Sequence, residues 1–174
     1  MMAPQVKVLI SERRIQDRIK KLAIQISQDY QGKDLILVSI LRGSFVFLSD
    51  LIRAMTTPLE VDFMAVSSYG NARESTGVVR LLNDLSSDVS GRHVLVVEDI
   101  VDTGLTWQYI RANLLTRRPA SLRILTLLDK RERRQVDVPV DYAGFIIPNH
   151  FVVGYGLDHL QKLRNLTYIG VLEG

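Results

Sequence analysis

The residues with the clearest chemical potential lie in one run, from Val94 to Thr106. Four apolar residues lead into the carboxylates Glu98 and Asp99, and Asp102 then opens a Thr-Gly-Leu-Thr turn. The apolar residues predict a buried parallel strand. The turn opens a helix-like stretch, so its backbone N–H groups, hydroxyls and helix dipole suit a phosphate. Because carboxylates repel phosphate, a divalent cation or sugar hydroxyls must lie between them. The run therefore predicts a sugar phosphate held with Mg²⁺.

Two other interpretations of this run stay open. Asp102 to Thr106 also fits a plain strand-to-helix turn in which Thr or Asp caps the helix. A phosphoacceptor aspartate, as in response regulators, fits the acidic residues but explains neither the Thr-Gly-Leu-Thr turn nor the other loops. The adjacent carboxylates favour the sugar phosphate, since two charges at the end of a buried strand are costly without partners.

Strands and helices are expected to alternate along the chain. Strands are predicted at Val6–Ile10, Leu35–Leu41, Val61–Val66, Val78–Leu82, from Val94, and at Leu122–Leu128, Ala143–Ile147, Phe151–Val153 and Leu166–Leu172. Helices are predicted after Ser11, with apolar positions from Ile15 to Ile26, then after Ser44 to about Ala54, and from about Thr103 to Thr116. This alternation predicts the α/β class, a doubly wound and mostly parallel sheet flanked by helices.

Charged residues follow three of the predicted strands directly. Arg42-Gly43, Glu98-Asp99 and Asp129-Lys130 each come just past the carboxyl end of a strand. Ligands of open α/β sheets bind outside these ends. We therefore expect one site at this rim of the sheet.

The composition describes a soluble globular chain of 174 residues, which predicts one domain. With 47% hydrophobic and 24% charged residues, disorder is not expected. The absence of cysteine excludes disulfides and thiolate metal sites and fits a cytoplasmic location. No secretory signal is visible and no apolar stretch approaches the ~20 residues of a membrane span.

The net charge of +3 indicates a solvated basic surface. The basic cluster Lys130–Arg134 lacks interleaved aromatic residues, so a nucleic-acid partner is not expected. Neither a G-x-G-x-x-G nor a P-loop motif occurs, which removes the main support for those nucleotide sites. His93, His150 and His159 are scattered, so a zinc site is not expected.

Five segments, in the same order, resemble the motifs of type I phosphoribosyltransferases. Val97–Thr106 is similar to the phosphoribosyl pyrophosphate signature, in the form seen in the hypoxanthine-guanine members. The others are Leu41–Phe45 as the pyrophosphate loop, Ser68–Gly70 with Thr76–Gly77 as the flexible catalytic loop, Leu128–Arg131 as the purine-specificity strand end, and Phe151–Asp158 with Arg164 as the purine and magnesium segment. The ordered set covers nearly all of the chain from Leu35 to Val171.

The resemblance implies a single domain, residues 1–174, with a core at about 35–147. A small hood subdomain would come from about 1–10 and 148–174, and a mobile catalytic loop would close the site. The implied reaction belongs to purine salvage. Phosphoribose passes from 5-phospho-α-D-ribose 1-diphosphate to N9 of a 6-oxopurine, hypoxanthine or guanine, giving IMP or GMP and pyrophosphate. A homodimer or homotetramer is also implied.

On the sugar side, the resemblance assigns a role to each matching residue. The phosphoribose contacts are Glu98, Asp99, Asp102, Thr103, Gly104, Leu105 and Thr106. The metal residues are Glu98, Asp99 and Asp158. The pyrophosphate contacts are Arg42, Gly43 and Arg164, although relatives often carry Lys where this chain has Arg42. The family also forms a cis peptide at this point, which no sequence pattern shows.

On the purine side, Asp102 is implied as the general base that accepts the N7 proton. Lys130 would donate to O6 and so reject 6-amino purines. Phe151 would stack on the base, although an aromatic residue beside Val152 also fits a core position. Val152 would read the purine edge, near Asp158.

Ser68 and Tyr69 would close over the reacting centre and exclude water, whereas a surface loop without catalytic duty is the plainer interpretation. A regulator on the same fold, which senses the sugar donor or binds nucleic acid, is the alternative function. The presence of Asp102, Lys130, Ser68 and Tyr69, without a helix-turn-helix extension, favours the enzyme.

Overall fold

The computed structural model describes residues 5–69 and 78–173, which form two sheets and three α-helices. The strands are β1 (Gln5–Ile10), β2 (Leu35–Leu41), β3 (Glu60–Tyr69), β4 (Val78–Asn83), β5 (His93–Val101), β6 (Ser121–Asp129), β7 (Tyr142–Ile146), β8 (Val152–Val153) and β9 (Ile169–Glu173). The helices are α1 (Glu12–Asp29), α2 (Phe45–Ala54) and α3 (Leu105–Leu115), with a 3₁₀ turn η1 (Arg131–Arg133). Helices alternate with strands as expected for the α/β class.

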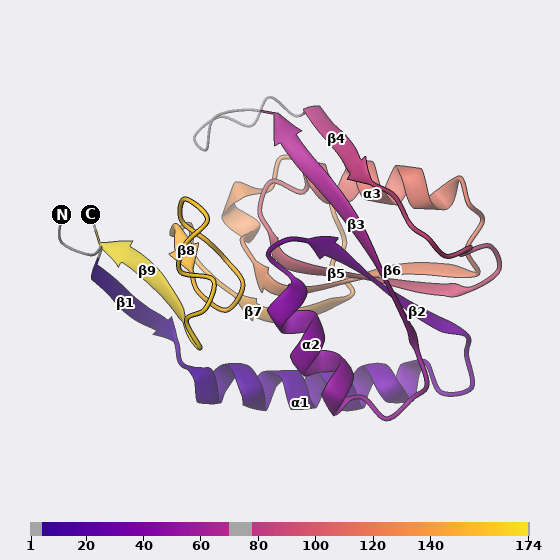
Figure 1. Ribbon diagram of the computed structural model, residues 1–174, viewed down its shortest axis with the longest axis horizontal. Coiled ribbons are helices and arrows are strands. Elements are labelled where there is room, and N and C mark those ends of the chain that lie inside the picture. The colour runs from indigo at the N-terminus through magenta and orange to yellow at the C-terminus, as the bar shows by residue number, and fades with distance from the viewer. Residues whose placement is uncertain (1–4, 70–77, 174) are drawn as a thin grey trace.

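The main sheet has the strand order β4-β3-β2-β5-β6-β7. Its strands pair in parallel except β4, which runs antiparallel to β3. Helices α1 and α2 lie on one side of this sheet and α3 on the other (Figure 1). The predicted mostly parallel, doubly wound sheet is therefore confirmed.

Both faces of the central strands are apolar because both faces are covered. Alternate residues of β2 point to opposite sides, so Leu35 and Leu37 join the core beneath α1 and α2, whereas Ile36 and Val38 join the core beneath α3. This arrangement explains the unbroken apolar runs that the sequence shows.

Helix α1 begins at the predicted capping residue. The Ser11 hydroxyl accepts a hydrogen bond from the Arg14 backbone N–H at 3.4 Å. The predicted apolar face is buried throughout, from Ile15 to Ile26. The 3.6-residue period therefore placed this helix correctly.

A second, antiparallel sheet has the order β1-β9-β8 and joins the two ends of the described chain. Figure 1 shows it beside the main sheet, close to the end at which β2 and β5 terminate. The segment between β8 and β9 leaves this small sheet and reaches that rim. It consists of the residues from Gly154 to Tyr168.

The predicted end of the strand before the acidic pair is wrong. Glu98 and Asp99 were expected just past a strand, but β5 continues to Val101. The reason is the parallel ladder with β6, whose register runs on to Val101 opposite Asp129. The acidic pair is thus part of the strand, held at fixed positions by its neighbours.

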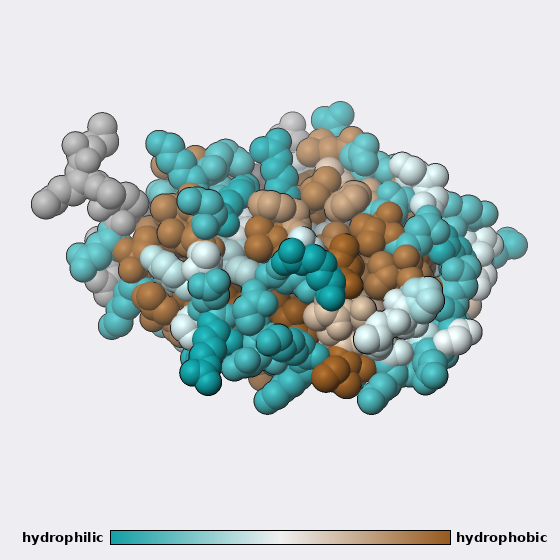
Figure 2. Space-filling model, turned by 60° about the horizontal axis from the view of Figure 1, so that its bottom comes forward, coloured by the Kyte–Doolittle hydropathy of each residue, from teal (hydrophilic) through white to brown (hydrophobic). Residues whose placement is uncertain are grey.

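No helix within the described ranges combines the length and the apolar character that a membrane crossing requires. On the face shown in Figure 2, hydrophilic residues lie between small patches of hydrophobic residues.

Candidate active site

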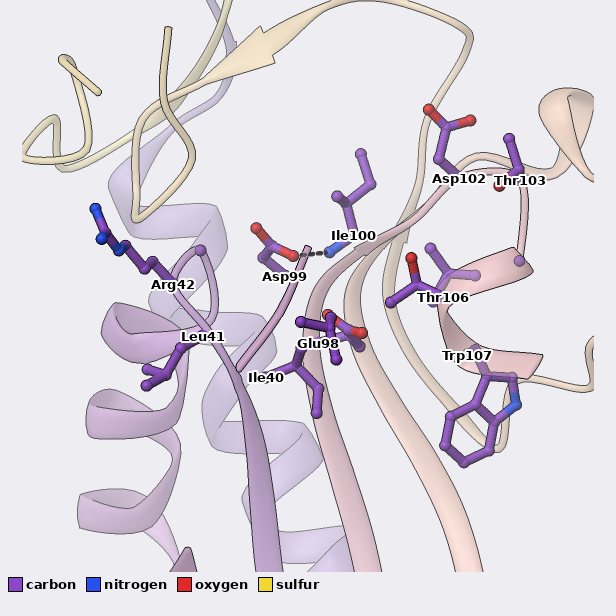
Figure 3. Close-up of a pocket in the computed structure, with 14 residues that line it drawn as sticks. Ile40, Leu41, Arg42, Glu98, Asp99, Ile100, Asp102, Thr103, Thr106 and Trp107 are labelled. Carbon is purple, nitrogen blue, oxygen red and sulfur yellow. Dashed lines mark hydrogen bonds between the residues drawn. The ribbon is translucent and has the colours of Figure 1, made fainter. Parts of the chain in front are cut away.

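A pocket of about 280 Å³ opens at the carboxyl ends of β2 and β5. Figure 3 shows its three walls, with Arg42 on one side, Glu98 and Asp99 in the middle, and Thr103 and Thr106 on the other side. Arg42 follows β2, the acidic pair lies near the end of β5, and the two threonines lie at the start of α3. The parallel sheet therefore brings the expected basic, acidic and hydroxyl groups to one rim.

The two neighbouring carboxylates of β5 are held away from bulk water. Glu98 is only 6% exposed. Burial, together with the Asp99 charge, raises the pKa of Glu98 well above its usual value. Burial also raises the pKa of Asp99 to about 6. The Ile100 backbone N–H donates to the Asp99 carboxylate at 2.8 Å, and this hydrogen bond opposes the rise in pKa. No residue in the described ranges forms an ion pair with either carboxylate.

The turn into α3 leaves its backbone donors available. Gly104 occupies the capping position with φ of 87°, and no side chain caps the helix there. The Thr103 hydroxyl accepts only a long hydrogen bond, 3.4 Å, from the Leu105 N–H. Unpaired N–H groups at the positive end of a helix form an anion site. The interpretation of this turn as a helix end capped by Thr or Asp is therefore not supported.

Gly104 also permits a close approach of a second loop. A Cβ at this position would lie 2.8 Å from Val138 Cγ2 and 3.0 Å from Val136 Cγ2. The Gln135 N–H donates to the Thr103 carbonyl at 2.9 Å. The loop after η1 thus packs on the turn from Thr103 to Thr106 and fixes its shape.

The loop after β2 approaches the acidic pair from the other side. Its Leu41–Arg42 peptide is cis. A Cβ on Gly43 would lie only 1.6 Å from Asp99 Oδ2, so this position tolerates no side chain while Asp99 keeps its rotamer. The loop therefore brings its backbone at Gly43 directly against the Asp99 carboxylate, while the Arg42 side chain points away from it at the same wall of the pocket (Figure 3).

A second pocket, of about 290 Å³, adjoins the first and shares Ile100 and Asp102 with it. Its other lining residues are Lys130, Arg133, Asn149, Phe151, Val152, Leu157 and Asp158. Asp102 Oδ2 lies 4.0 Å from Lys130 Nζ, and Asp102 Oδ1 lies 3.3 Å from Arg133 Nε. The Oδ1 atom is buried and has no partner in hydrogen-bond geometry among the described residues. An acceptor and a cationic donor thus stand side by side at the junction of the pockets.

Lys130 is fixed by the strand end that precedes it. Its N–H donates to the Val101 carbonyl at 3.0 Å. The buried Asp129 carboxylate accepts from Arg131 Nε at 3.0 Å and also pairs with Arg134. Burial lowers the pKa of Lys130, while the Asp102 charge opposes this shift. The backbone of Lys130 is thus fixed at the end of β6, and its buried side chain lies near Asp102.

The segment between β8 and β9 completes the rim. Arg164 pairs with Asp158 at 2.8 Å and donates to the Gly156 carbonyl at 2.8 Å. A Cβ on Gly156 would lie 2.1 Å from the Gly43 carbonyl, so this segment touches the loop after β2. Two loops from distant parts of the chain therefore meet at the Arg42 side of the first pocket.

Comparison with known proteins identifies the family of this site. The family model of the phosphoribosyl transferase domain matches residues 7–160. The chain belongs to this family. A hypoxanthine phosphoribosyltransferase of Haemophilus influenzae is 51% identical in an alignment of 173 residues that covers 97% of this chain and 97% of its own. A hypoxanthine-guanine phosphoribosyltransferase of Streptococcus pneumoniae is 50% identical, over 96% of this chain and 93% of its own.

A solved structure has the same fold as this family member. The crystal structure of a hypoxanthine phosphoribosyltransferase from Staphylococcus aureus superposes with a TM-score of 0.92 at 49% sequence identity. The match covers 96% of this chain and 91% of that one. The resemblance found in the sequence motifs is thus confirmed over nearly the whole chain.

The structure gathers most of the predicted site residues of this phosphoribosyltransferase. The first pocket is lined by Arg42, Gly43, Glu98, Asp99, Asp102, Thr103, Gly104 and Thr106, and the second by Lys130, Phe151, Val152 and Asp158. Arg164 joins through Asp158, whereas Leu105 begins α3 and lines neither pocket. Phe151 is 52% exposed, which excludes the core position considered for it.

Part of the predicted catalytic loop lies outside the described residues, namely Gly70, Thr76 and Gly77. Ser68 and Tyr69 end β3 opposite Val79 and Val78, and their side chains are likewise outside the described part. Their proposed role at the reacting centre stays a prediction.

Three polar residues at the site were not expected from the sequence. Arg133 and Asn149 line the second pocket, and Gln161 accepts hydrogen bonds at the rim. Arg133 belongs to a basic cluster that the sequence does show, but nothing local indicates that it faces Asp102. Nothing in the sequence indicates the position of Gln161, because its hydrogen bond with Arg42 spans 119 positions and forms only in the folded chain.

Within the described ranges, no group of three or more His, Asp or Glu side chains is arranged to hold a metal ion. The donors still suit Mg²⁺, because this ion is commonly bound by one or two carboxylates together with substrate oxygens and water. Glu98 and Asp99 provide two such carboxylates without a cationic partner. Asp158 is engaged by Arg164.

Proposed function

We propose that this chain transfers phosphoribose from 5-phospho-α-D-ribose 1-diphosphate to N9 of hypoxanthine or guanine, giving IMP or GMP and pyrophosphate. Family membership and relatives near 50% identity that carry these names support the activity. One observation carries the choice of base. The Asp102 carboxylate, whose Oδ1 atom has no hydrogen-bond partner among the described residues, lies beside the buried Lys130 ammonium at the junction of two pockets, with 4.0 Å between Asp102 Oδ2 and Lys130 Nζ. A 6-oxopurine presents a matching pair, an N7–H donor beside the O6 acceptor.

The proposed chemistry moves one proton and breaks one bond. N9 of the base forms a bond to C1 of the ribose, while the C1–O bond breaks and its electron pair leaves with pyrophosphate. The N7 proton passes to the Asp102 carboxylate, which acts as the general base. The Lys130 ammonium stabilises the O6 oxygen, and it would face a second donor if the base were adenine.

The sugar donor would lie across the first pocket. The N–H groups and hydroxyls of the turn at Thr103 to Thr106 would hold the 5-phosphate. Glu98 and Asp99 would meet the ribose hydroxyls, and with Asp158 they would hold Mg²⁺. Bound Mg²⁺ would neutralise the departing pyrophosphate. Arg42, Gly43 and Arg164 would bind the pyrophosphate, since guanidinium groups form paired hydrogen bonds with phosphate oxygens.

The remaining proposed roles concern the base and the water. Phe151, exposed in the second pocket, would stack on the purine, and Val152 would read its edge through backbone groups. Ser68 and Tyr69 would shield the reacting centre from water. We also propose that the chain forms a homodimer or homotetramer, which the family resemblance implies; analytical ultracentrifugation would show a single monomeric species if this is wrong.

The activity is tested by incubating the purified protein with 5-phospho-α-D-ribose 1-diphosphate, Mg²⁺ and one base at a time. We expect IMP from hypoxanthine and GMP from guanine, and no AMP from adenine. Initial rates with xanthine would rank the third 6-oxopurine. No turnover with any of these bases, together with tight RNA binding, would support the regulator instead.

A further inference from the structure

Gln161 connects the two arginines that face the pyrophosphate side of the site. Its Oε1 atom accepts a hydrogen bond from Arg42 Nη1 at 3.3 Å and another from Arg164 Nη2 at 3.0 Å. Arg42 follows β2, and Arg164 lies 122 positions later in the segment between β8 and β9. A single side-chain oxygen therefore joins the loop after β2 to the segment between β8 and β9.

The backbone holds this oxygen in place. Gln161 has φ of 64°, and its neighbour Leu160 has φ of 50°, so the loop turns through the left-handed region at this point. The Gln161 N–H donates to Asp158 Oδ2 at 2.8 Å, and Asp158 Oδ1 pairs with Arg164 at 2.8 Å. Asp158 thus fixes both the glutamine and one of the arginines that the glutamine binds.

The neutrality of this bridge matters for anion binding. Two guanidinium groups that share one acceptor lie close enough to repel each other, and an amide oxygen lowers this cost without cancelling either charge. A carboxylate would make stronger, charge-assisted hydrogen bonds but would remove one positive charge from the pair. An amide therefore preserves the most positive potential for a highly charged ligand.

We propose that Gln161 is a positioning residue that holds Arg42 and Arg164 as a ready-made clamp for the pyrophosphate group, without adding a negative charge to the one that Asp158 already places beside Arg164. It acts through the arginines and serves both the sugar donor and the pyrophosphate product. The proposal rests on the proposed function, because that function places pyrophosphate at these arginines. It adds a residue to the pyrophosphate side. It also predicts that the charge of the side chain at position 161, more than its hydrogen bonds, determines the affinity for pyrophosphate.

The deciding variant is Gln161→Glu, because it separates structural support from anion binding. The new carboxylate can still bridge both arginines, so thermal stability should be equal or higher. Affinity for pyrophosphate and for the sugar donor should nevertheless fall about 10-fold, since one charge of the clamp is neutralised. A residue with only a structural role would show the opposite pattern, with affinity retained.

Two further variants complete the series. Gln161→Asn keeps an amide and tolerates the left-handed backbone, but its side chain is one methylene too short to reach both arginines. It should weaken pyrophosphate binding several-fold without the charge change. Lys162→Gln is the matched control, since it lowers the net charge by one unit, as Gln161→Glu does, but at the adjacent, exposed position. It should leave pyrophosphate affinity within about two-fold, which separates the clamp from the general field of the loop.

The readouts are calorimetric binding of pyrophosphate in magnesium-containing buffer and, separately, binding of IMP. IMP carries the 5-phosphate and the base but no pyrophosphate, so its affinity should stay unchanged in all variants. Unchanged pyrophosphate affinity in Gln161→Glu, or a parallel loss of IMP affinity, would overturn the proposal. Failure of the proposed function is a distinct result, since the parent protein itself would then form no IMP from hypoxanthine.

Discussion

The Tyr155 hydroxyl donates a hydrogen bond to the Asp50 carboxylate of α2, across 105 positions of sequence. Tyr155 lies between Gly154 and Gly156, in the segment that touches the loop after β2. Helix α2 follows that same loop. Burial, followed by the hydrogen bond to Asp50, raises the pKa of Tyr155, which keeps the hydroxyl protonated as a donor. The contact thus ties together the two chain segments that form the Arg42 side of the pocket.

Replacing this donor should loosen that connection. Tyr155→Phe removes one hydrogen bond from a buried ring and leaves Asp50 with Gln16 and Arg53 as partners. We expect a loss of about 1–2 kcal/mol in the free energy of unfolding, measured by urea denaturation. The KM for the sugar donor should rise more than the KM for hypoxanthine. Equal stability of the variant and the parent would contradict this account.

Asp50 also predicts how stability changes with pH. Burial alone would raise the pKa of Asp50, but the hydrogen bonds from Tyr155 and two other donors outweigh it and lower that pKa below its usual value. A carboxylate with a lowered pKa in the folded state contributes stability above its unfolded pKa and loses it as the pH falls through the folded pKa.

Asp50→Asn should therefore be less stable than the parent at neutral pH, and the difference should shrink as the pH falls below about 4. Denaturation curves at several pH values measure this difference. Asn is the suitable replacement, since it is uncharged at every pH and can still accept from Tyr155. A difference between the two proteins that is constant with pH would exclude the assigned linkage.

These contacts show which parts of the molecule the sequence could predict. Local periodicity is sufficient for α1, because Ser11 and the apolar positions from Ile15 to Ile26 lie on one short segment. The alternation of strands and helices is likewise a local pattern, so the parallel sheet and its ligand-binding rim were predictable. The end of β5 was not, since it depends on pairing with β6.

The candidate site divides in the same way. Glu98, Asp99 and the turn from Thr103 to Thr106 form one continuous run, so their chemistry is visible in the sequence. Contacts such as that of Arg133 with Asp102, or of Gln161 with Arg42, depend on how loops fold over the rim. No periodicity or local motif encodes such contacts. They require the tertiary structure.

Gly43 offers a test of the close packing at the acidic pair. Gly43→Ala would place a Cβ 1.6 Å from Asp99 Oδ2, so either the carboxylate or the loop must move. A displacement of about 1 Å in a catalytic site can reduce the rate about 10²-fold, and we expect a loss of that order in kcat/KM for the sugar donor. Steady-state kinetics with hypoxanthine measure the effect.

A double-mutant cycle, measured by thermal stability, tests whether Gly43→Ala acts through a clash with Asp99. In an Asp99→Ala background, Gly43→Ala no longer meets Oδ2 or Cγ, and only the Asp99 Cβ remains, at 3.4 Å. The thermal destabilisation by Gly43→Ala should then largely disappear, which indicates direct coupling of the two positions. The same destabilisation in both backgrounds would show that the strain lies elsewhere.

Lys130 is expected to determine which purines bind. Lys130→Ala removes the donor for O6 and leaves the Asp102 carboxylate with Arg133 as its remaining cationic neighbour in the described site. The KM for hypoxanthine should rise at least about 10-fold, while the KM for the sugar donor changes little. Discrimination against adenine should also weaken. Lys21→Ala, at an exposed position of α1, serves as the control. A Lys130→Ala protein that rejects adenine as strictly as the parent would refute this specificity role.

Asp102 is expected to act on the base and not on the donor. Asp102→Asn keeps the size of the side chain and an acceptor oxygen, so both pockets should keep their shape. An amide cannot take up the N7 proton, and turnover should fall by ~10²–10⁴, the range for loss of a general base.

Binding of the sugar donor, measured by calorimetry, should persist in Asp102→Asn, because the carboxylate gains nothing from facing a phosphate. Asp102→Glu provides the complementary test. It restores a proton acceptor, but the longer side chain must fit between Lys130 and Arg133, which lie 4.0 Å and 3.3 Å from the Asp102 carboxylate. It should therefore recover only part of the turnover. If Asp102→Asn turned over at the parental rate, another group would have to accept the N7 proton, and no described carboxylate other than Asp158 lines the second pocket with it.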